Sequence, residues 1–298
     1  MLPTAGRYLR IKSPHYSIRD SLQHLCDGTG AYDFPDMVEL DRRLTPKEYR
    51  ACTDSGPSPI VEQKLGYQAV LLARSTLYGP LRLTARDVFL ALARRVPDPE
   101  RPGELMSNPY TDWNQVDPAL PSSQIKFFGP VPEAARRLQA ELLLTAGCNT
   151  YFWIAALRDT DTERYNEICQ TLRTDSAYQG WSTGSSFTDF LLGEPTAIGI
   201  FDGIPPVGER LVVNPVDGVT PDMNTVASGT YPLAHTLFLY VDKNRLNSTN
   251  FMDDLLLALV SHATSVGRSP AFWAFVPLDP AEQAALRKDR YRFKPLQF

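Results

Sequence analysis

The sequence predicts an α/β fold, because short apolar runs rich in β-branched residues alternate along the chain with segments of helical periodicity. Alternation of this kind indicates helices layered against a mainly parallel sheet. The chain has 298 residues, of which 43% are hydrophobic. It is therefore long enough for two ordinary domains or one large one, with a substantial core in either case.

The predicted elements follow one another in order. Residues 65–75, LGYQAVLLARS, form an apolar run bounded by Gly and polar residues, which is typical of a buried strand. A helix is expected next over TARDVFLALARRV (84–96), with Thr84 as its N-cap. The further expected elements are the strand QIKFFG (124–129), helices at 132–146 and 162–175, the strands TAIGIF (196–201) and HTLFLYVD (235–242), and a core helix in FMDDLLLALVSHA (251–263).

Charge and hydropathy exclude several kinds of partner. The net charge is −4 with both signs interspersed, which gives no electrostatic reason to expect nucleic acid or an acidic membrane surface as a partner. No apolar run is long enough to span a bilayer, so we expect no transmembrane segment. The first residues, MLPTAGRYLRIKS, lack the pattern of a signal peptide, so the sequence is either that of a mature form or that of a protein that is not exported.

The four cysteines fall into two local pairs, Cys26 with Cys52 and Cys148 with Cys169. This spacing permits two disulfides, which would favour an oxidising compartment. Four buried thiols in a cytosolic protein fit the same spacing. Neither pair has CxxC spacing, so zinc binding and thioredoxin-like chemistry are not expected.

Several segments together resemble the phosphate-binding proteins of bacterial ABC importers, which belong to the type II periplasmic solute-binding family. The likeness runs from about LCDGTGAYDFPDM to the C-terminus, and its most specific part is VDGVTPDMNTVASGTYPL (216–233) followed by TLFLYVDK (236–243). The resemblance supports both cysteine pairings, because related exported proteins carry cysteines at matching places. It implies a periplasmic or otherwise extracytoplasmic location.

The resemblance implies two α/β lobes joined by two hinge crossover strands, here YQAVLLA (67–73) and AIGIFDG (197–203). Lobe one would comprise residues 1–75 and 205–298 and would be shortened at its N-terminus. Lobe two would comprise residues 76–204. The ligand of such a protein is held between the lobes, which close about the hinges.

The resemblance also implies which residues would meet an oxyanion. In GPVPEAARRLQ (129–139) the family's Gly-Pro turn and an arginine are kept, so Arg137 is a candidate and its neighbour Arg136 is a second. The segment DMVELDRRLTPKEY (36–49) offers Arg42 or Arg43. A further candidate set is the loop GWSTGSSFTDFLL (180–192), in which Thr183, Ser185 and Ser186 offer hydroxyls.

The sequence departs from the family pattern at places that matter for binding. Glu133, Ala134, Ala135 and Leu138 replace positions that carry hydroxyl, glycine and carboxylate residues in the family, and no Gly-Ser-Ser-Thr turn precedes Cys26. Each candidate also has a purely structural interpretation. The arginines could face solvent or pair with nearby carboxylates, and the Ser-rich stretch could be a plain loop.

Two functions are consistent with these observations. The first is a non-enzymatic solute-binding protein that captures phosphate or another oxyanion and delivers it to an ABC permease or another membrane-associated complex. The second is a degenerate paralogue that no longer binds phosphate and acts as a structural or protein-interaction subunit. No catalytic or cofactor motif appears and the histidines lack metal-ligand spacing, so neither an enzyme nor a cofactor or metal protein is expected.

Overall fold

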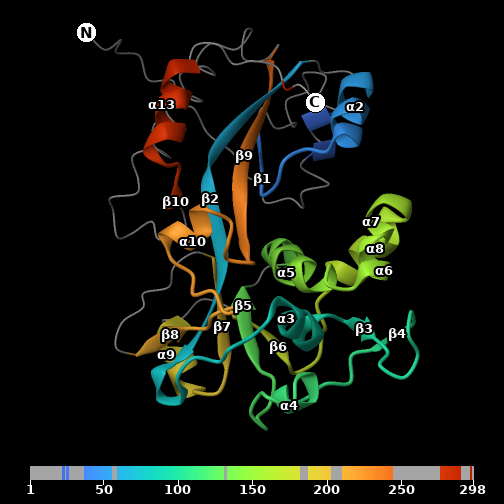
Figure 1. Cartoon of the computed structure of the whole chain (residues 1–298), viewed down its shortest axis with the longest axis vertical. Coiled ribbons are helices and arrows are strands. Elements are labelled where there is room, and N and C mark those ends of the chain that lie inside the picture. The colour runs from blue at the N-terminus through green and yellow to red at the C-terminus, as the bar shows by residue number, and fades with distance from the viewer. Residues whose placement is uncertain are drawn as a thin grey trace.

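The computed structural model describes residues 22–23, 25–26, 37–55, 59–130, 133–181, 187–202, 210–243, 276–289 and 296. Its elements form an upper and a lower lobe (Figure 1). An eight-stranded sheet runs through both, in the order β1-β9-β2-β7-β5-β6, with β10 and β8 also paired to β2.

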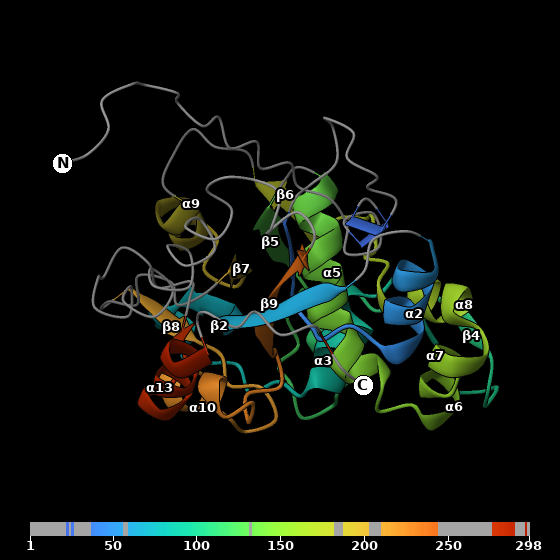
Figure 2. The same ribbon diagram turned by 90° about the horizontal axis from the view of Figure 1, so that it is seen from above.

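The upper lobe is built on the first part of strand β2 (Ile60–Ser75), which pairs from Ile60 to Ala69 with β9 (Ala234–Asp242). Strand β1 (Met37–Leu40) lies on the other side of β9, and β10 (Val276–Pro277) pairs with β2. Helices α13 (Pro280–Asp289) and α2 (Pro46–Ser55) flank this part of the sheet on its two sides, as Figures 1 and 2 show.

The lower lobe is built on the last part of β2, which pairs from Val70 to Ser75 with β7 (Ile198–Asp202) and β8 (Leu211–Val213). Strand β5 (Phe127–Pro130) lies between β7 and β6 (Tyr178–Trp181). A small separate hairpin joins β3 (Arg95–Pro97) to β4 (Leu105–Ser107). The remaining helices are η1 (Thr76–Tyr78), α3 (Ala85–Leu92), α4 (Trp113–Val116), α5 (Glu133–Cys148), α6 (Phe152–Ala155), α7 (Leu157–Thr160), α8 (Thr162–Cys169), α9 (Phe187–Gly193) and α10 (Met223–Ala227).

Strand β2 passes from one lobe into the other, and it contains the first crossover expected from the sequence, residues 67–73. Part of the second expected crossover, residues 197–203, forms β7, which pairs with the lower half of β2. Strand β8 also pairs with that half, and β9 returns the chain to the upper sheet. The division into lobes at residues 75/76 and 204/205 stays a prediction.

The expectation of a mainly parallel sheet is wrong. Among the strands of the described residues, only the pairings of β5 with β6 and with β7 are parallel. The reason is that the long strand β2 pairs with four other strands and runs antiparallel to all of them, namely β7, β8, β9 and β10.

Two helices are shorter than the sequence predicted. Helix α3 begins at its expected cap, where Thr84 and Asp87 form a reciprocal capping box, but it ends at Leu92 rather than at residue 96. Helix α8 ends at Cys169 rather than at residue 175. Both stop because the segments that follow them pair with each other: Arg94 donates its N–H to Thr171, and Arg173 donates its N–H to Leu92.

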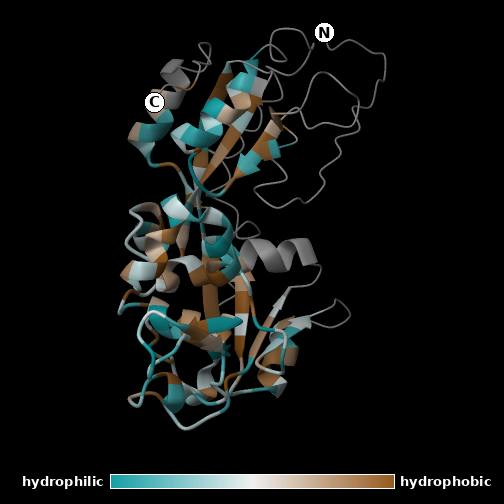
Figure 3. Cartoon of the chain, turned by 90° about the vertical axis from the view of Figure 1, so that its right-hand side faces the viewer, coloured by the Kyte–Doolittle hydropathy of each residue, from teal (hydrophilic) through white to brown (hydrophobic). Residues whose placement is uncertain are grey.

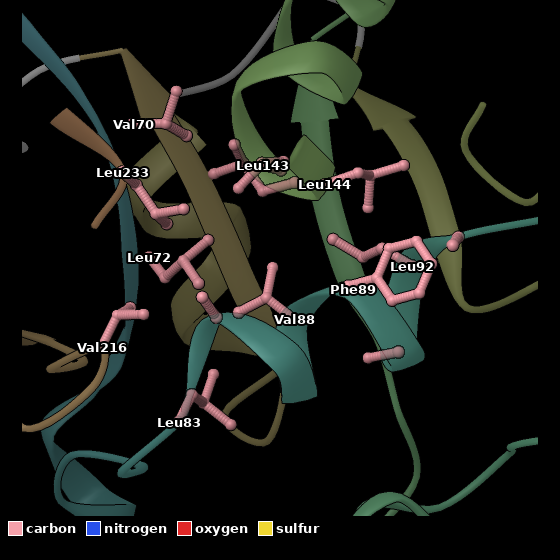
Figure 4. Close-up of a cluster of buried hydrophobic side chains, with 14 of the residues drawn as sticks. Val70, Leu72, Leu83, Val88, Phe89, Leu92, Leu143, Leu144, Val216 and Leu233 are labelled. Carbon is pink, nitrogen blue, oxygen red and sulfur yellow. The ribbon is translucent and has the colours of Figure 1, made fainter. Parts of the chain in front are cut away.

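The main core lies between α3, α5 and the lower sheet. Figure 4 shows side chains from β2, α3 and α5 gathered there, including Leu72, Phe89 and Leu144, which are all fully buried. In Figure 3 hydrophobic residues concentrate on the strands of both lobes. The elements predicted at 65–75, 132–146, 196–201 and 235–242 are present as β2, α5, β7 and β9, whereas the helix predicted at 251–263 lies outside the described residues.

Both predicted disulfides are confirmed. Cys26 is bonded to Cys52 in the upper lobe, and Cys148 is bonded to Cys169 in the lower lobe, where it ties α5 to α8. All four cysteine side chains are buried. No helix in the described part of the chain combines the length and the apolar character that crossing a bilayer requires.

Candidate functional site

Of the residues predicted to bind an oxyanion, the structure describes the side chains of two, Arg42 and Arg43. Arg136 and Arg137 belong to helix α5, but their side chains lie outside the described part of the chain. The hydroxyl candidates Thr183, Ser185 and Ser186 also lie outside it. The geometry of the site is therefore built from Arg42, Arg43 and their neighbours.

Arg42 follows strand β1 and precedes α2, and its guanidinium is held by Glu48 in a bidentate ion pair. The Nη1 atom lies 2.9 Å from Oε2 of Glu48, and Nη2 lies 2.7 Å from Oε1. Glu48 is fixed by the start of α2, because Thr45 donates both its N–H and its hydroxyl to Oε2, and Glu48 returns its own N–H to the Thr45 hydroxyl. This reciprocal pattern is a capping box, with Pro46 at the first helical position.

Arg43 points to a different place. Its Nε lies 3.0 Å from both carboxylate oxygens of Glu62 on β2. Glu62 also accepts a hydrogen bond of 2.7 Å from the hydroxyl of Tyr240, which accepts one from the backbone N–H of Leu44. The structure therefore separates the two arginines, and Arg43 belongs to a network on the upper sheet.

The charge of Arg42 acts on carboxyl groups of both lobes. Glu141 on α5 of the lower lobe interacts with Arg42, with Asp41 and with Glu48 of the upper lobe. Figure 1 shows α5 at the level between the upper sheet and the rest of the lower lobe. Burial, reinforced by the negative charge of Asp41, raises the pKa of Glu141 to about 7.

Asp41 is a buried residue, with 9% of its surface exposed to solvent. Its Oδ1 atom is buried and has no hydrogen-bond partner. Burial raises the pKa of Asp41 to about 6, against the opposing effect of the Arg42 charge, while Glu39 raises it further. We call Asp41, Arg42, Glu48 and Glu141 the interlobe cluster.

The three carboxylates of this cluster were not predicted from the sequence as parts of a site. Glu48 carries a local signal, because Thr45 followed three residues later by Glu predicts a capping box. Glu141 has no such signal, since only the packing of the lobes brings α5 to the loop after β1. The cluster holds three carboxyl groups and one guanidinium, so with all of them ionised it is negative.

The lower lobe presents a second feature that is common at ligand sites. Strands β5, β6 and β7 are parallel, and α5 begins directly after β5, so the N-terminus of α5 lies at the carboxyl edge of these strands. Ligands of α/β proteins commonly bind at such an edge, where helix N-termini favour anions. Beside it, Trp181 lies 4.2 Å from Phe190 between ring centroids and packs against Phe187.

His235 is not a cationic group for an anionic ligand. Burial lowers the pKa of His235 to about 4, so its ring is neutral near pH 7; its Nε2 lies 3.3 Å from the amide oxygen of Gln68. Within the described residues, no three His, Cys, Asp or Glu side chains come together in a way that could hold a metal ion.

Comparisons with known proteins agree with this architecture. The family described as "PBP superfamily domain" matches residues 19–265. The fold is similar to that of a possible phosphate binding protein from Planctomyces limnophilus, with a TM-score of 0.59 at 15% identity over 91% of this chain and 84% of the other. It is also similar to the phosphate binding protein of Stenotrophomonas maltophilia, with a TM-score of 0.51 at 12% identity over 90% and 83% of the two chains. At these identities the structures establish the fold, and no curated protein sequence matches the chain.

Proposed function

The chain belongs to the PBP superfamily and has the two-lobed type II periplasmic-binding-protein fold predicted from its sequence, and from this premise we propose that it is an extracytoplasmic solute-binding protein. Its ligand would be phosphate or a related oxyanion bound between the lobes. Its partner would be an ABC permease or another membrane-associated complex that receives the ligand. The role requires no catalytic step.

The observation that supports the proposal is the guanidinium of Arg42, whose charge acts on carboxyl groups of both lobes. A guanidinium is the side chain best suited to bind an oxyanion through two parallel hydrogen bonds. Arg42 already makes such a pair with the carboxylate of Glu48, at 2.7 and 2.9 Å. An oxyanion would compete with Glu48 for the same two donors. Arg43, Arg136, Arg137, Thr183, Ser185 and Ser186 remain proposed contacts.

The two disulfides support the extracytoplasmic part of the proposal. Disulfides persist in oxidising compartments and are rare in reducing ones. Together they engage all four cysteines of the chain, so no thiol is left free. A protein that works outside the cytoplasm is expected to have this cysteine chemistry.

One observation favours the second candidate function, a paralogue that has lost phosphate and serves as a structural or protein-interaction subunit. Within the interlobe cluster, Glu48 neutralises Arg42 and the carboxylates of Asp41 and Glu141 add negative charge. A free anion meets repulsion there near neutral pH. Each donor missing from a buried anion site costs about 1 to 3 kcal/mol, so a few missing donors would remove useful affinity.

We expect a thermal-shift titration at fixed ionic strength to separate the two functions. At one hundred times its Kd, a specific ligand stabilises the fold by about 2.7 kcal/mol. Phosphate, sulfate, arsenate and simple phosphonates would be compared. For the proposed function we expect one of them to raise the melting temperature of the wild type but not that of the Arg42→Ala variant.

The matched control is Arg50→Ala, because Arg50 is an exposed arginine on α2 of the same lobe. This variant should respond to the ligand like the wild type. If millimolar concentrations of every oxyanion leave the melting temperature of the wild type unchanged, the proposed function is wrong and the second candidate stands. If the ligand raises the melting temperature of the wild type and of Arg42→Ala equally, Arg42 does not bind the ligand.

A further inference from the structure

Residues 215–233 contain the segment VDGVTPDMNTVASGTYPL, to which the proposed function gives no role. We call residues 215–233 the hinge strap. They follow β8 of the lower lobe and lead into β9 of the upper lobe. The side chains of Val216, Val226, Tyr231 and Leu233 are buried in the main core, and Figure 4 shows two of them, Val216 and Leu233, beside residues of β2. The hinge strap therefore joins the two lobes as a packed element.

The first end of the hinge strap is fixed to the lower lobe at the start of α3. Leu83 donates its N–H to the carbonyl of Pro215 at 3.2 Å and accepts the N–H of Asp217 at 2.9 Å. The Oδ1 atom of Asp217 accepts the N–H of Ala85, the first residue of α3, at 3.1 Å. Asp217 and Gly218 have φ values of 50° and 76°, as a tight turn requires. This end of the strap therefore moves with α3.

The other end of the hinge strap is bonded to β2 where that strand passes between the lobes. Strand β2 pairs with β9 as far as Ala69 and with β7 from Val70 onward. The N–H of Val70 donates to the carbonyl of Leu233 at 3.0 Å. The carbonyl of Val70 accepts the hydroxyl of Tyr231 at 3.2 Å. Both backbone groups of Val70 are therefore held by the strap.

Tyr231 is itself held in place by helix α10. Its backbone N–H donates to the carbonyl of Thr225 at 3.0 Å, and Thr225 forms a capping box with Asp222 at the start of α10. Figure 1 shows α10 beside β2 at the level between the two lobes. The Tyr231 residue is 1% exposed, and burial raises the pKa of its hydroxyl, which therefore stays protonated and can donate to Val70.

We propose that the hinge strap sets the angle between the two lobes, and that the hydrogen bond from the Tyr231 hydroxyl to the Val70 carbonyl restrains their rotation. Tyr231 is then a positioning residue of the hinge. This inference requires no ligand, so it stands apart from the proposed function.

The position of the bond explains why it restrains rotation. Lobes move about a few residues that absorb the change in backbone angles. The step from Ala69 to Val70 is the natural place in β2, because the strand changes partners there. Rotation at this step must break the bonds that Val70 makes to the strap. Without the hydroxyl of Tyr231, the buried carbonyl of Val70 loses its donor and the step becomes easier to bend.

Lobe rotation can be measured as a distribution of distances. Asp54 on α2 and Arg164 on α8 are exposed and lie in different lobes. Because no native cysteine is free, an Asp54→Cys/Arg164→Cys protein would carry spin labels only at these sites. By double electron–electron resonance we expect a narrow distribution for this protein. Adding Tyr231→Phe, which removes the hydroxyl alone, should broaden the distribution.

The matched control is Tyr165→Phe in the same labelled protein. Tyr165 is also buried, at 3% exposure, and its hydroxyl donates to Asn149 at 2.8 Å, but both residues lie in the lower lobe. This variant should keep the narrow distribution although it too loses a buried hydrogen bond. An unchanged distribution after Tyr231→Phe would overturn the proposal, and so would equal broadening by the two substitutions.

Amide hydrogen exchange checks the restraint at the residue itself. In Tyr231→Phe we expect the N–H of Val70 to exchange about tenfold faster than in the wild type, because the strap holds that residue less tightly. The reference is the N–H of Phe127, which donates to the carbonyl of Ala177 within the lower lobe. Faster exchange at Val70 with little change at Phe127 supports the proposal. If both exchange faster by the same factor, the hydroxyl only contributes to overall stability and the proposal is wrong.

Discussion

Removal of both disulfides is expected to lower the free energy of unfolding by about 6 kcal/mol, at about 3 kcal/mol for each loop closed. The bonded cysteines are separated by 26 residues in the first disulfide and by 21 in the second. Each bond restricts the unfolded chain, and each also holds helices together in its lobe. Because globular proteins are stable by only about 5 to 15 kcal/mol, this loss is enough to unfold much of the protein at body temperature.

Chemical denaturation of two double variants would check this prediction. Cys26→Ala/Cys52→Ala removes the bond of the upper lobe, and Cys148→Ala/Cys169→Ala removes that of the lower lobe. Alanine leaves no buried hydroxyl at these enclosed positions. Each double variant should lose about 3 kcal/mol, and reductant should destabilise the wild type further than either variant alone. If the fully reduced wild type, with four thiols titrated, unfolds at the same denaturant concentration as the oxidised protein, the disulfides are not stabilising.

Local sequence signals accounted for much of the fold. The apolar run at 65–75 marked β2, although the strand begins earlier, at Ile60. Thr84 followed by Asp87 marked the start of α3, because a capping box depends on neighbouring residues alone. The spacing of the cysteines only permitted two disulfides, and the resemblance to exported phosphate-binding proteins supported both pairings.

Features set by contacts between distant segments escaped prediction. The ends of α3 and α8 depend on the pairing of residues 92–94 with 171–173, which no local pattern reveals. The antiparallel partners of β2 come from separate parts of the chain. For the candidate site, Arg42 was predicted from a resemblance, but the effect of the Glu141 charge on it depends on how distant parts of the chain pack.

Gly147→Ala is expected to destabilise the protein by about 2 to 3 kcal/mol, although the same change stabilises most helices. Gly147 lies inside α5, where alanine alone would gain roughly 1 kcal/mol from its better helix propensity. A Cβ atom at this position, however, would overlap the backbone carbonyl of Ala85 at the start of α3 and would press on Cβ of Phe89. Backbone cannot rotate away as a flexible side chain can, so α3 and α5 must separate, and the core between them loses contacts.

Gly193→Ala is the matched control, because Gly193 is also a helical glycine, at the end of α9, and a Cβ atom there would have no neighbour within 4 Å. Urea unfolding of both variants distinguishes crowding from a general effect of replacing glycine. The control should be neutral or slightly stabilised, while Gly147→Ala should unfold at a lower urea concentration with an unchanged m-value. A Gly147→Ala protein as stable as the wild type would mean that α3 and α5 do not approach each other this closely. The position of Glu141 would then have to be reconsidered, because Glu141 lies on the same helix as Gly147.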